Sequence, residues 1–435
     1  MAPAGDAVRP WRVLEFFAGM GGMRVALRES GVEAEVVASY EISEICERAY
    51  RHNFPPDVVA PDAPRALALR RTTIERIAAG ELDALAADVW LMSPPCQPFS
   101  RSGRFRDASD ARTSALLHLV EVLPRLRHPP SRILLENVIG FERSDSRRLL
   151  LEALATLGWQ AAELDLRPEG FGLPNSRPRY YGLFRSPAAA AADADAADGD
   201  ALRWRDASVA LQDEPVRLQR RGAGDSAAQC LPLGDFLQES GELAELEAEM
   251  KCSLELPQEI MSTHVQGGGR YDMHLRSDRT SACLTKGYGR FPRGYGPLVL
   301  IDEADEACVQ QRPKLSAASP ADGSEAEGGS ETYNVWRDGS RLRYLSCREQ
   351  LRLMGYPEWY AFPRDMTRRE RFSLVGNSLN VRVVAWLLSH LLRAPAPAPK
   401  TPPAAIMAPS EAGPTSLAPA AAETGAGTEA SCCVG

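Results

Sequence analysis

The sequence of 435 residues lacks the features that mark several broad classes of protein. It has no uninterrupted apolar run of about 18 residues, so no membrane-spanning helix is predicted. Its first residues carry no basic segment followed by an apolar one, so no secretory signal is predicted. Nine cysteines are present without a C-x-x-C pair, which disfavours both a zinc site and a disulfide framework. We therefore expect no bound metal, no membrane association, and a cytoplasmic or nuclear location.

A surplus of basic residues is also missing, since the net charge is −8. The charge is unevenly spread along the chain. Residues 1–186 hold 24 arginines and 24 acids and are neutral, residues 187–331 carry 14 basic and 26 acidic groups (net −12), and residues 332–435 carry 12 basic and 8 acidic groups (net +4). Net acidity predicts weak non-specific affinity for duplex DNA. Because the acidity is concentrated in one stretch, other surfaces remain suited to contact nucleic acid.

Three stretches contain few of the residues that build a core. Residues 187–230 are rich in Ala and Asp, residues 301–331 in Ala, Ser, Gly and Glu, and residues 394–435 in Ala and Pro. Such compositions bury too little apolar surface to offset the entropy of ordering. They predict a low-complexity insertion, a flexible insertion and a disordered tail, respectively.

The remaining sequence opens with the pattern of a nucleotide-type α/β unit. Residues 13–17 are an apolar strand, residues 18–22 form a glycine turn, and residues 23–28 have helical spacing. The turn reads G-x-G-G, which is neither the dinucleotide pattern nor a P-loop, and a plain connection is an alternative. A second predicted strand, 35–40, ends at Glu41, where such folds hold the ribose hydroxyls of an adenosine. Together these features predict a nucleoside cofactor.

A cysteine lies on a rigid loop further along the chain. The apolar run 89–92 predicts a buried strand, and Pro94 and Pro95 then fix φ and remove backbone donors. Cys96 follows directly, at a position where a thiolate is placed to act as a nucleophile. A lone cysteine in a turn is otherwise most simply a small buried apolar residue.

Two more polar groups are predicted to reach the same edge of the sheet. The apolar run 133–135 is a buried strand that leads into Glu136. Arg177 and Arg179 are two residues apart, so they lie on one side of an extended segment. Taken alone, Glu136 is also consistent with a helix cap, and the arginines with a solvated face.

Five motifs, in this order, resemble those of the cytosine-5 nucleic-acid methyltransferases: residues 17–22 (FAGMGG), 95–97 (PCQ), 136–138 (ENV), 177–179 (RPR) and 376–378 (GNS). The resemblance covers about residues 11–186 and 262–393. Within that family the chain is most similar to the small branch that methylates the anticodon loop of aspartate tRNA. Residues 93–101, 173–177, 283–289 and 374–381 carry this finer resemblance, although Leu284 stands where that branch usually has Phe.

The resemblance implies a Rossmann-like α/β sheet of the S-adenosylmethionine-dependent methyltransferases, with helices on both faces and a small target-recognition lobe. The catalytic domain is then discontinuous, with residues 11–186 and 332–393, and the recognition lobe spans residues 231–300. The implied cofactor is S-adenosylmethionine and the implied partner is tRNA, with DNA as the alternative. We expect a monomer.

The family pattern also implies a role for individual residues. Cys96 would attack C6 of cytosine, Glu136 would donate to N3, Arg179 would hold O2, and Arg177 would orient the base or bind phosphate. Cofactor contacts are implied for Phe17, Gly19, Gly21, Gly22, Glu41, Ile42, Ile74, Pro95, Asn377 and Leu379. Substrate contacts are implied for Gln97, Ser100, Val138, Cys283, Thr285, Lys286, Tyr288 and Arg290.

The segment assigned to target recognition mixes basic and aromatic residues. Its basic residues are Arg270, Arg276, Arg279, Lys286, Arg290 and Arg293, and its aromatic residues are Tyr271, Tyr288, Phe291 and Tyr295. This mixture suits phosphate contacts and stacking on unpaired bases, although a glycine-rich loop with solvated charges is the alternative. Residues 233–254 predict an amphipathic helix, residues 344–357 a helix with a capping box at Ser346 and Glu349, and residues 378–392 a final helix.

Three functions fit the sequence: a tRNA cytosine-5 methyltransferase, a DNA cytosine-5 methyltransferase, and a non-catalytic nucleic-acid binding module on the same fold. The intact set of Cys96, Glu136, Arg177 and Arg179 disfavours the third. The short recognition segment disfavours the second. The choice of RNA over DNA rests on the resemblance alone, since no residue visibly recognises a 2′-hydroxyl.

Overall fold

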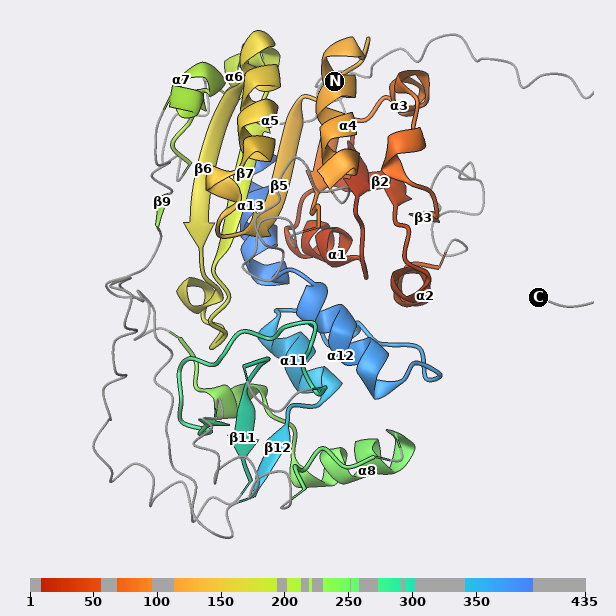
Figure 1. Cartoon of the computed structure of the whole chain (residues 1–435), viewed down its shortest axis with the longest axis vertical. Coiled ribbons are helices and arrows are strands. Elements are labelled where there is room, and N and C mark those ends of the chain that lie inside the picture. Colours follow the sequence, from red (N-terminus) through yellow and green to blue (C-terminus); the bar gives the residue numbers. More distant parts are fainter. Residues whose placement is uncertain are drawn as a thin grey trace, which may run out of the picture.

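A computed structural model describes residues 9–55, 69–95, 113–193, 202–212, 219–220, 230–250, 252–257, 273–290, 294–301 and 341–393. Figure 1 shows a large sheet flanked by helices and, beyond its lower end, a smaller lobe. The expectations for residues 302–331 and 394–435 lie outside the described residues. Among the described helices, none is both long and apolar enough to cross a membrane.

The large sheet alternates with helices in the first half of the chain. Its strands are β1 (Trp11–Phe16), β2 (Ala34–Tyr40), β3 (Leu69–Arg70), β4 (Val89–Met92), β5 (Arg132–Val138), β6 (Gln160–Leu166), β7 (Arg179–Arg185), β8 (Arg205–Asp206) and β9 (Gln219–Arg220). The helices of this part are α1 (Gly22–Glu29), α2 (Glu44–Asn53), α3 (Ala79–Leu85), α4 (Ser114–Val122), α5 (Asp145–Thr156), α6 (Pro187–Asp193) and α7 (Ala207–Gln212). Short 3₁₀ turns are η3 (Ile74–Arg76), η8 (Leu123–Arg125), η9 (Phe141–Arg143) and η10 (Pro168–Phe171).

The strand order is β3-β2-β1-β4-β5-β7-β6-β8, with β9 paired to β6. Strands β1 to β5 pair in parallel, whereas β7 is antiparallel to both β5 and β6. The chain order reverses beside β1, which is the point where open α/β sheets bind ligands at the carboxyl ends of their strands. The predicted candidate residues after β1, β2 and β4, and at the end of β5, therefore meet at one edge.

Helices cover both faces of this sheet, as predicted. One hydrophobic cluster joins Val13, Leu91 and Leu134 to α1 and to the last helix of the chain, α13 (Val381–Leu391). A second cluster joins Leu14 and Trp90, the strand neighbours of those residues, to α3, α4, α5 and α7. The alternation follows from the strand geometry, in which successive side chains point to opposite faces. The sheet is therefore buried on both sides, and α13 packs against α1.

The smaller lobe contains a three-stranded sheet in the order β10-β11-β12. Its elements are η12 (Leu233–Phe236), α8 (Ser240–Met250), β10 (Met273–His274), β11 (Leu298–Leu300) and β12 (Leu342–Tyr344). The predicted catalytic domain boundary at residue 332 is wrong, because β12 pairs with β11 and belongs to this lobe. The helix predicted over 233–254 is shorter, since the chain turns at η12 before α8 begins.

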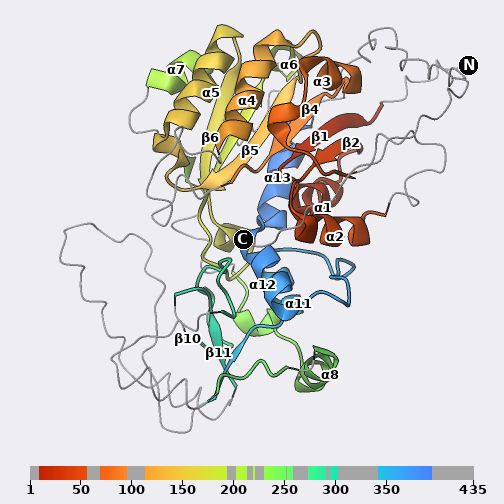
Figure 2. The same ribbon diagram turned by 45° about the vertical axis from the view of Figure 1, so that its right-hand side comes forward.

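Two helices lie between the lobe and the sheet in both views: α11 (Cys347–Leu353) and α12 (Arg368–Asn377) (Figures 1 and 2). The predicted capping box of α11 is confirmed, with Ser346 accepting from the Glu349 N–H and Glu349 accepting from the Ser346 N–H. The predicted final helix is confirmed as α13, which begins after its N-cap Asn380.

The prediction of an unstructured insertion at 187–230 is wrong for its described residues. Helix α6 ends at Asp193, whose carboxylate accepts two hydrogen bonds of 2.7 Å from the Arg132 guanidinium and one of 3.1 Å from Arg185. The Arg185 guanidinium also lies over the Trp204 ring, and α7 packs on α5. The alanine-rich composition gave no sign that Asp193 pairs with two arginines of the sheet, one buried and one partly buried.

This ion pair yields a stability prediction. Burial alone raises the pKa of Asp193, but the hydrogen bonds from Arg132 and Arg185 outweigh it, so the pKa lies below its ordinary value. Asp193→Ala leaves Arg132 buried without its partner and should lower the free energy of unfolding by about 3 kcal/mol or more at pH 7.

Urea denaturation checks this prediction. Because the folded-state pKa is lowered, the wild-type advantage should shrink as the pH falls below about 4. The control is Glu152→Ala, which breaks an exposed pair with Arg148 and should change stability by less than about 0.5 kcal/mol. Equal effects of the two variants would contradict the structural role of Asp193.

Candidate active site

The loop after β1 has the backbone geometry of a ligand cradle. Phe17 and Gly19 have φ values of 56° and 55°, a region that non-glycine residues occupy at a cost and chiefly at functional sites. A Cβ built on Gly19 would meet no heavy atom nearer than the Phe17 carbonyl oxygen at 4.0 Å. A ligand can therefore approach the backbone at Gly19 closely.

Glu41 lies beside this loop, directly after β2. Its Oε2 accepts the Gly19 N–H at 2.7 Å, and its Oε1 accepts the N–H groups of Ile42 and Ser43 at 2.9 and 2.8 Å. A carboxylate has about four acceptor sites, so it retains capacity for a hydroxyl of a ribose. Ile42 is 64% exposed next to it, which provides an apolar surface for a flat ring.

Gly21 and Gly22 are required for packing as well, and their contact with the cofactor stays a prediction. A Cβ on Gly21 would lie 2.7 Å from the Phe54 ring, and one on Gly22 would lie 2.8 Å from the Tyr356 hydroxyl and 3.0 Å from Leu379. These two glycines are therefore required for the packing of α1 against its neighbours. Leu379 is buried in that contact, which ties the segment after α12 to the glycine loop.

Two other predicted cofactor residues differ in their exposure. Ile74 is 5% exposed and packs in the core on the α3 and α4 face, and its contact with the adenine stays a prediction. Asn377 is exposed at the end of α12. It remains a prediction for the cofactor side of the site.

The loop after β4 is anchored from both neighbouring strands. The Ser93 hydroxyl donates to the Phe17 carbonyl oxygen at 3.1 Å, and the Asn137 side-chain amide donates to the Pro94 carbonyl oxygen at 3.3 Å. Pro95 is exposed at the end of this described stretch. The predicted residues Cys96, Gln97 and Ser100 lie outside the described residues, directly after an anchored segment.

Glu136 and Arg179 form the polar pair at the end of β5 and the start of β7. Arg179 Nε lies 3.4 Å from Glu136 Oε1, and Glu136 is 8% exposed. Burial raises the pKa of Glu136, and the positive charges of Arg179 and Arg177 oppose this rise. Val138, the last residue of β5, is paired with Arg179 in the strand register. A carboxyl group with a raised pKa can act as a proton donor.

Arg177 is buried and its two terminal nitrogens are used within the protein. Nη1 donates to the Leu284 carbonyl oxygen at 2.7 Å and Nη2 donates to the Gly376 carbonyl oxygen at 3.1 Å, with a further bond to the Ser378 carbonyl oxygen. The expectation that Arg177 binds phosphate is wrong, because the side chain is 3% exposed. It joins the recognition lobe to the segment after α12.

The recognition lobe meets the catalytic domain at residues 283–286. Cys283 Sγ lies 3.6 Å from Arg177 Nη1, and the Thr285 hydroxyl donates to the Tyr295 carbonyl oxygen. A Cβ on Gly376 would lie 2.2 Å from the Thr285 backbone, so only glycine allows this contact. Lys286 and Arg290 are exposed beyond it.

Tyr288 does not have the role predicted from its neighbours. It is 3% exposed, packs against the Tyr344 and Phe372 rings, and donates from its hydroxyl to the Pro297 carbonyl oxygen at 2.6 Å. The expectation that Tyr288 stacks on a base is wrong, since its ring has no free face. Tyr295, which is 38% exposed, keeps an accessible ring; Tyr271 and Phe291 lie outside the described residues.

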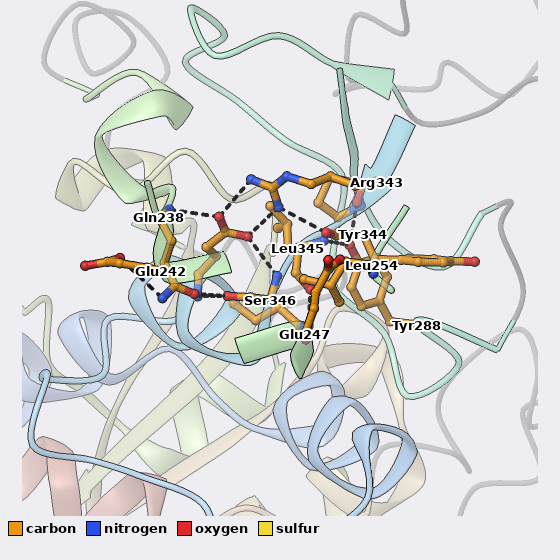
Figure 3. Close-up of polar contacts among 12 residues, drawn as sticks. Gln238, Glu242, Glu247, Leu254, Tyr288, Arg343, Tyr344, Leu345 and Ser346 are labelled. Atoms are coloured by element: carbon orange, nitrogen blue, oxygen red, sulfur yellow. Dashed lines mark hydrogen bonds and ion pairs between the residues drawn. The ribbon is translucent and has the colours of Figure 1, made fainter. Parts of the chain in front are cut away.

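Figure 3 shows the polar network that fixes this lobe to α11. Glu349 is fully buried, accepts two bonds of 2.8 Å from the Arg343 guanidinium, and accepts the Gln238 N–H at 2.9 Å. The sequence indicated Glu349 only as a helix cap. Its second role was missed because nothing in the local pattern identifies Arg343 as a partner.

Relatives resemble this chain over most of its length. A tRNA (cytosine(38)-C(5))-methyltransferase of Rattus norvegicus is 32% identical over 413 residues, which cover 88% of this chain and 100% of that protein. A DNA (cytosine-5)-methyltransferase of Dictyostelium discoideum is 31% identical over 390 residues, covering 88% of this chain and 94% of that protein. A solved structure of a Spodoptera frugiperda DNMT2 mutant has a TM-score of 0.63 at 27% identity and covers 88% of this chain and 99% of its own.

The family model described as C-5 cytosine-specific DNA methylase matches residues 11–393. Its methyl donor is S-adenosylmethionine, and the open backbone at Gly19, the Glu41 carboxylate and the exposed Ile42 fit that cofactor. The chain therefore belongs to the C-5 cytosine-specific DNA methylase family and is a cytosine-5 methyltransferase that uses S-adenosylmethionine.

Proposed function

We propose that the substrate is a cytosine in the anticodon loop of tRNA, with aspartate tRNA as the preferred species. The observation that carries the proposal is the end-to-end similarity to a relative whose name specifies cytosine 38 of tRNA. The exposed Lys286 and Arg290 of the recognition lobe support it, because basic side chains suit the phosphates of an unpaired loop. The target base must leave its stack to reach a buried pair such as Glu136 and Arg179.

The covalent step is assigned to Cys96. Cytosine C5 is a poor nucleophile, so the Cys96 thiolate attacks C6, which forms an S–C6 bond and makes C5 enamine-like. S-adenosylmethionine, when bound, supplies the methyl group that C5 accepts. Loss of the C5 proton to water and departure of the thiolate then restore the aromatic ring and the free enzyme.

Glu136 compensates the negative charge that this attack places on the ring. In its protonated form it gives a proton to N3 while the S–C6 bond forms, and the proton returns when the thiolate leaves. Arg179, whose Nε lies 3.4 Å from Glu136 Oε1, would donate to O2 of the same base. Arg177 acts as a positioning residue, because its bonds to Leu284 and Gly376 join the lobe to the end of α12.

A DNA substrate is the second candidate, since the Dictyostelium discoideum relative is named for DNA. The net charge of −8 makes duplex DNA a weak ligand. Transfer of labelled methyl groups to total tRNA and, in parallel, to genomic DNA separates the two, followed by mapping of the modified position. Methylated duplex DNA with unmodified tRNA would overturn the tRNA proposal.

The first prediction concerns Cys96. Cys96→Ala should lower methyl transfer at least about 10⁴-fold and leave cofactor affinity unchanged, because the thiol acts only on the base. The wild type should form a denaturant-stable adduct with tRNA containing 5-fluorocytosine, and the variant should form none. Cys252→Ala in the recognition lobe serves as the control and should retain both activities; turnover by Cys96→Ala would exclude the covalent route.

The second prediction concerns the pH dependence set by Glu136. Because burial raises its pKa, the acid form persists above the ordinary carboxyl range, and kcat/KM should fall as the pH rises through the raised value. Glu136→Gln cannot give a proton and should reduce kcat/KM by about 10² to 10⁴-fold. Its profile should lack that alkaline fall, and an unchanged alkaline limb in the variant would assign the limb to another group.

The third prediction concerns RNA binding. Lys286→Ala and Arg290→Ala should each weaken tRNA binding and reduce the slope of log K against log salt by about 0.7 to 1. Filter binding at several salt concentrations measures both effects. Arg125→Ala is the matched control, because Arg125 is exposed on η8 at the opposite edge of the sheet; an equal loss in all three variants would indicate non-specific charge attraction.

A further inference from the structure

A carboxyl group that the proposed mechanism does not use lies inside the sheet below the cofactor loop. Glu15 is on β1 and is 0% exposed. Its Oε2 lies 3.0 Å from the Ser39 hydroxyl oxygen and 2.8 Å from the Tyr50 hydroxyl oxygen. These two hydroxyl oxygens are themselves 2.7 Å apart. Three oxygens thus form a closed triangle with three hydrogen-bond distances.

The triangle cannot be satisfied when Glu15 is ionised. Each of its three contacts needs one proton, and the hydroxyls of Ser39 and Tyr50 supply two between them. A proton on Glu15 supplies the third and closes the ring. Among the described residues, Oε1 of Glu15 has no hydrogen-bond partner, and an unpartnered oxygen in the interior costs less on a neutral acid than on a carboxylate.

The charged and titratable groups around Glu15 oppose its protonation only in part. Burial raises its pKa to about 7, against the bonds from Tyr50 and Ser39 and the nearby positive charge and backbone N–H of Arg24 on α1. Arg24 donates to the Tyr50 hydroxyl at 3.2 Å. Tyr356 and Tyr360 interact electrostatically with Glu15 from the segment after α11. The β4 neighbour in register, Leu91, is apolar.

The ring connects the three elements that build the cofactor site. Glu15 comes two residues before Phe17 on the chain that forms the glycine loop. Ser39 comes two residues before Glu41, whose carboxylate accepts the Gly19 N–H. The Tyr50 ring lies against the Cα of Gly21, since a Cβ there would be 3.1 Å from it. Opening the ring therefore loosens the attachment of all three elements to one another.

We propose that Glu15 is a positioning residue whose protonated form locks the glycine loop, the end of β2 and α2 into the conformation that binds S-adenosylmethionine. Deprotonation leaves one of the three contacts without a proton and places a charge in the core. The affinity for the cofactor therefore falls as the pH rises through neutrality. This role concerns the cofactor site and does not depend on which nucleic acid is methylated.

The expected loss of cofactor affinity at higher pH has the same sign as the effect of this pKa on folding stability. The folded-state pKa of Glu15, about 7, is above its ordinary value. The stability from this group is fully present below the ordinary carboxyl pKa of about 4.3 and is lost as the pH rises through the folded value. A neutral replacement should remove this dependence.

The test measures binding of S-adenosylhomocysteine to the full chain by calorimetry from pH 6 to pH 8.5. The wild-type affinity should fall by about threefold to tenfold over this range relative to Glu15→Gln, which stays neutral and keeps a donor. The control Glu33→Gln removes an exposed carboxyl group at the start of the same region and should behave as the wild type. Because the ligand's own amino group titrates equally in every sample, the comparison isolates Glu15.

A second readout detects the proton directly. The infrared C=O stretch of a protonated carboxylic acid should persist in the wild type and in Glu33→Gln above pH 6 and should be reduced in Glu15→Gln. This measurement remains available if Glu15→Gln does not fold. The proposal is overturned if the band is absent above pH 6 in the wild type, or if wild type and Glu15→Gln show the same change in affinity with pH.

Discussion

The buried guanidinium of Arg177 is a central attachment of the recognition lobe to the rest of the chain. Arg177 donates to carbonyl oxygens of Leu284 in the lobe and of Gly376 and Ser378 in the carboxyl-terminal segment. Removing an arginine from water carries an unfavourable desolvation free energy, and each hydrogen bond to the charged group stabilises the folded state by about 1.5 to 3 kcal/mol. The carbonyl oxygens come from segments more than a hundred residues away in sequence, so the side chain holds both only when the lobe sits in one place.

A glycine makes this contact possible. At Gly376 the backbone of Thr285 approaches so closely that any Cβ would overlap with it. Gly22 has the same function against Tyr356 and Leu379. Glycines of the two family motifs thus serve the packing of distant segments. Among the described glycines of these two motifs, Gly19 is the one that combines a positive φ with open space in front of it, which is the geometry of a ligand-contacting glycine.

The sheet and the ends of its strands could be predicted because both depend on local sequence patterns. Apolar runs gave β1, β4 and β5, and parallel pairing brought Glu41, Pro95 and Glu136 to one edge. The roles of Arg177 and Tyr288 could not be predicted in this way. A basic residue and an aromatic residue in a polar, glycine-rich stretch have the composition of a nucleic-acid surface, and their burial follows from long-range contacts with Gly376 and Phe372. The composition of residues 187–212 predicted an unstructured insertion, and this was wrong for the same reason. The order of this segment depends on a long-range contact, the ion pair of Asp193 with Arg132 far earlier in the chain.

The two buried glutamates of the cofactor and base sites differ in what surrounds them. Both lie on the α1 and α13 face of the sheet, and burial raises the pKa of each. Glu136 faces two guanidinium groups, and in the proposed mechanism its proton moves to the base. Glu15 faces two hydroxyls inside the core, where its proton can only complete a ring. Environments of this kind assign different roles to chemically identical groups. In these two proposals Glu136 exchanges a proton with the base and Glu15 uses its proton to hold the cofactor loop, and both roles need the protonated carboxyl group that burial favours.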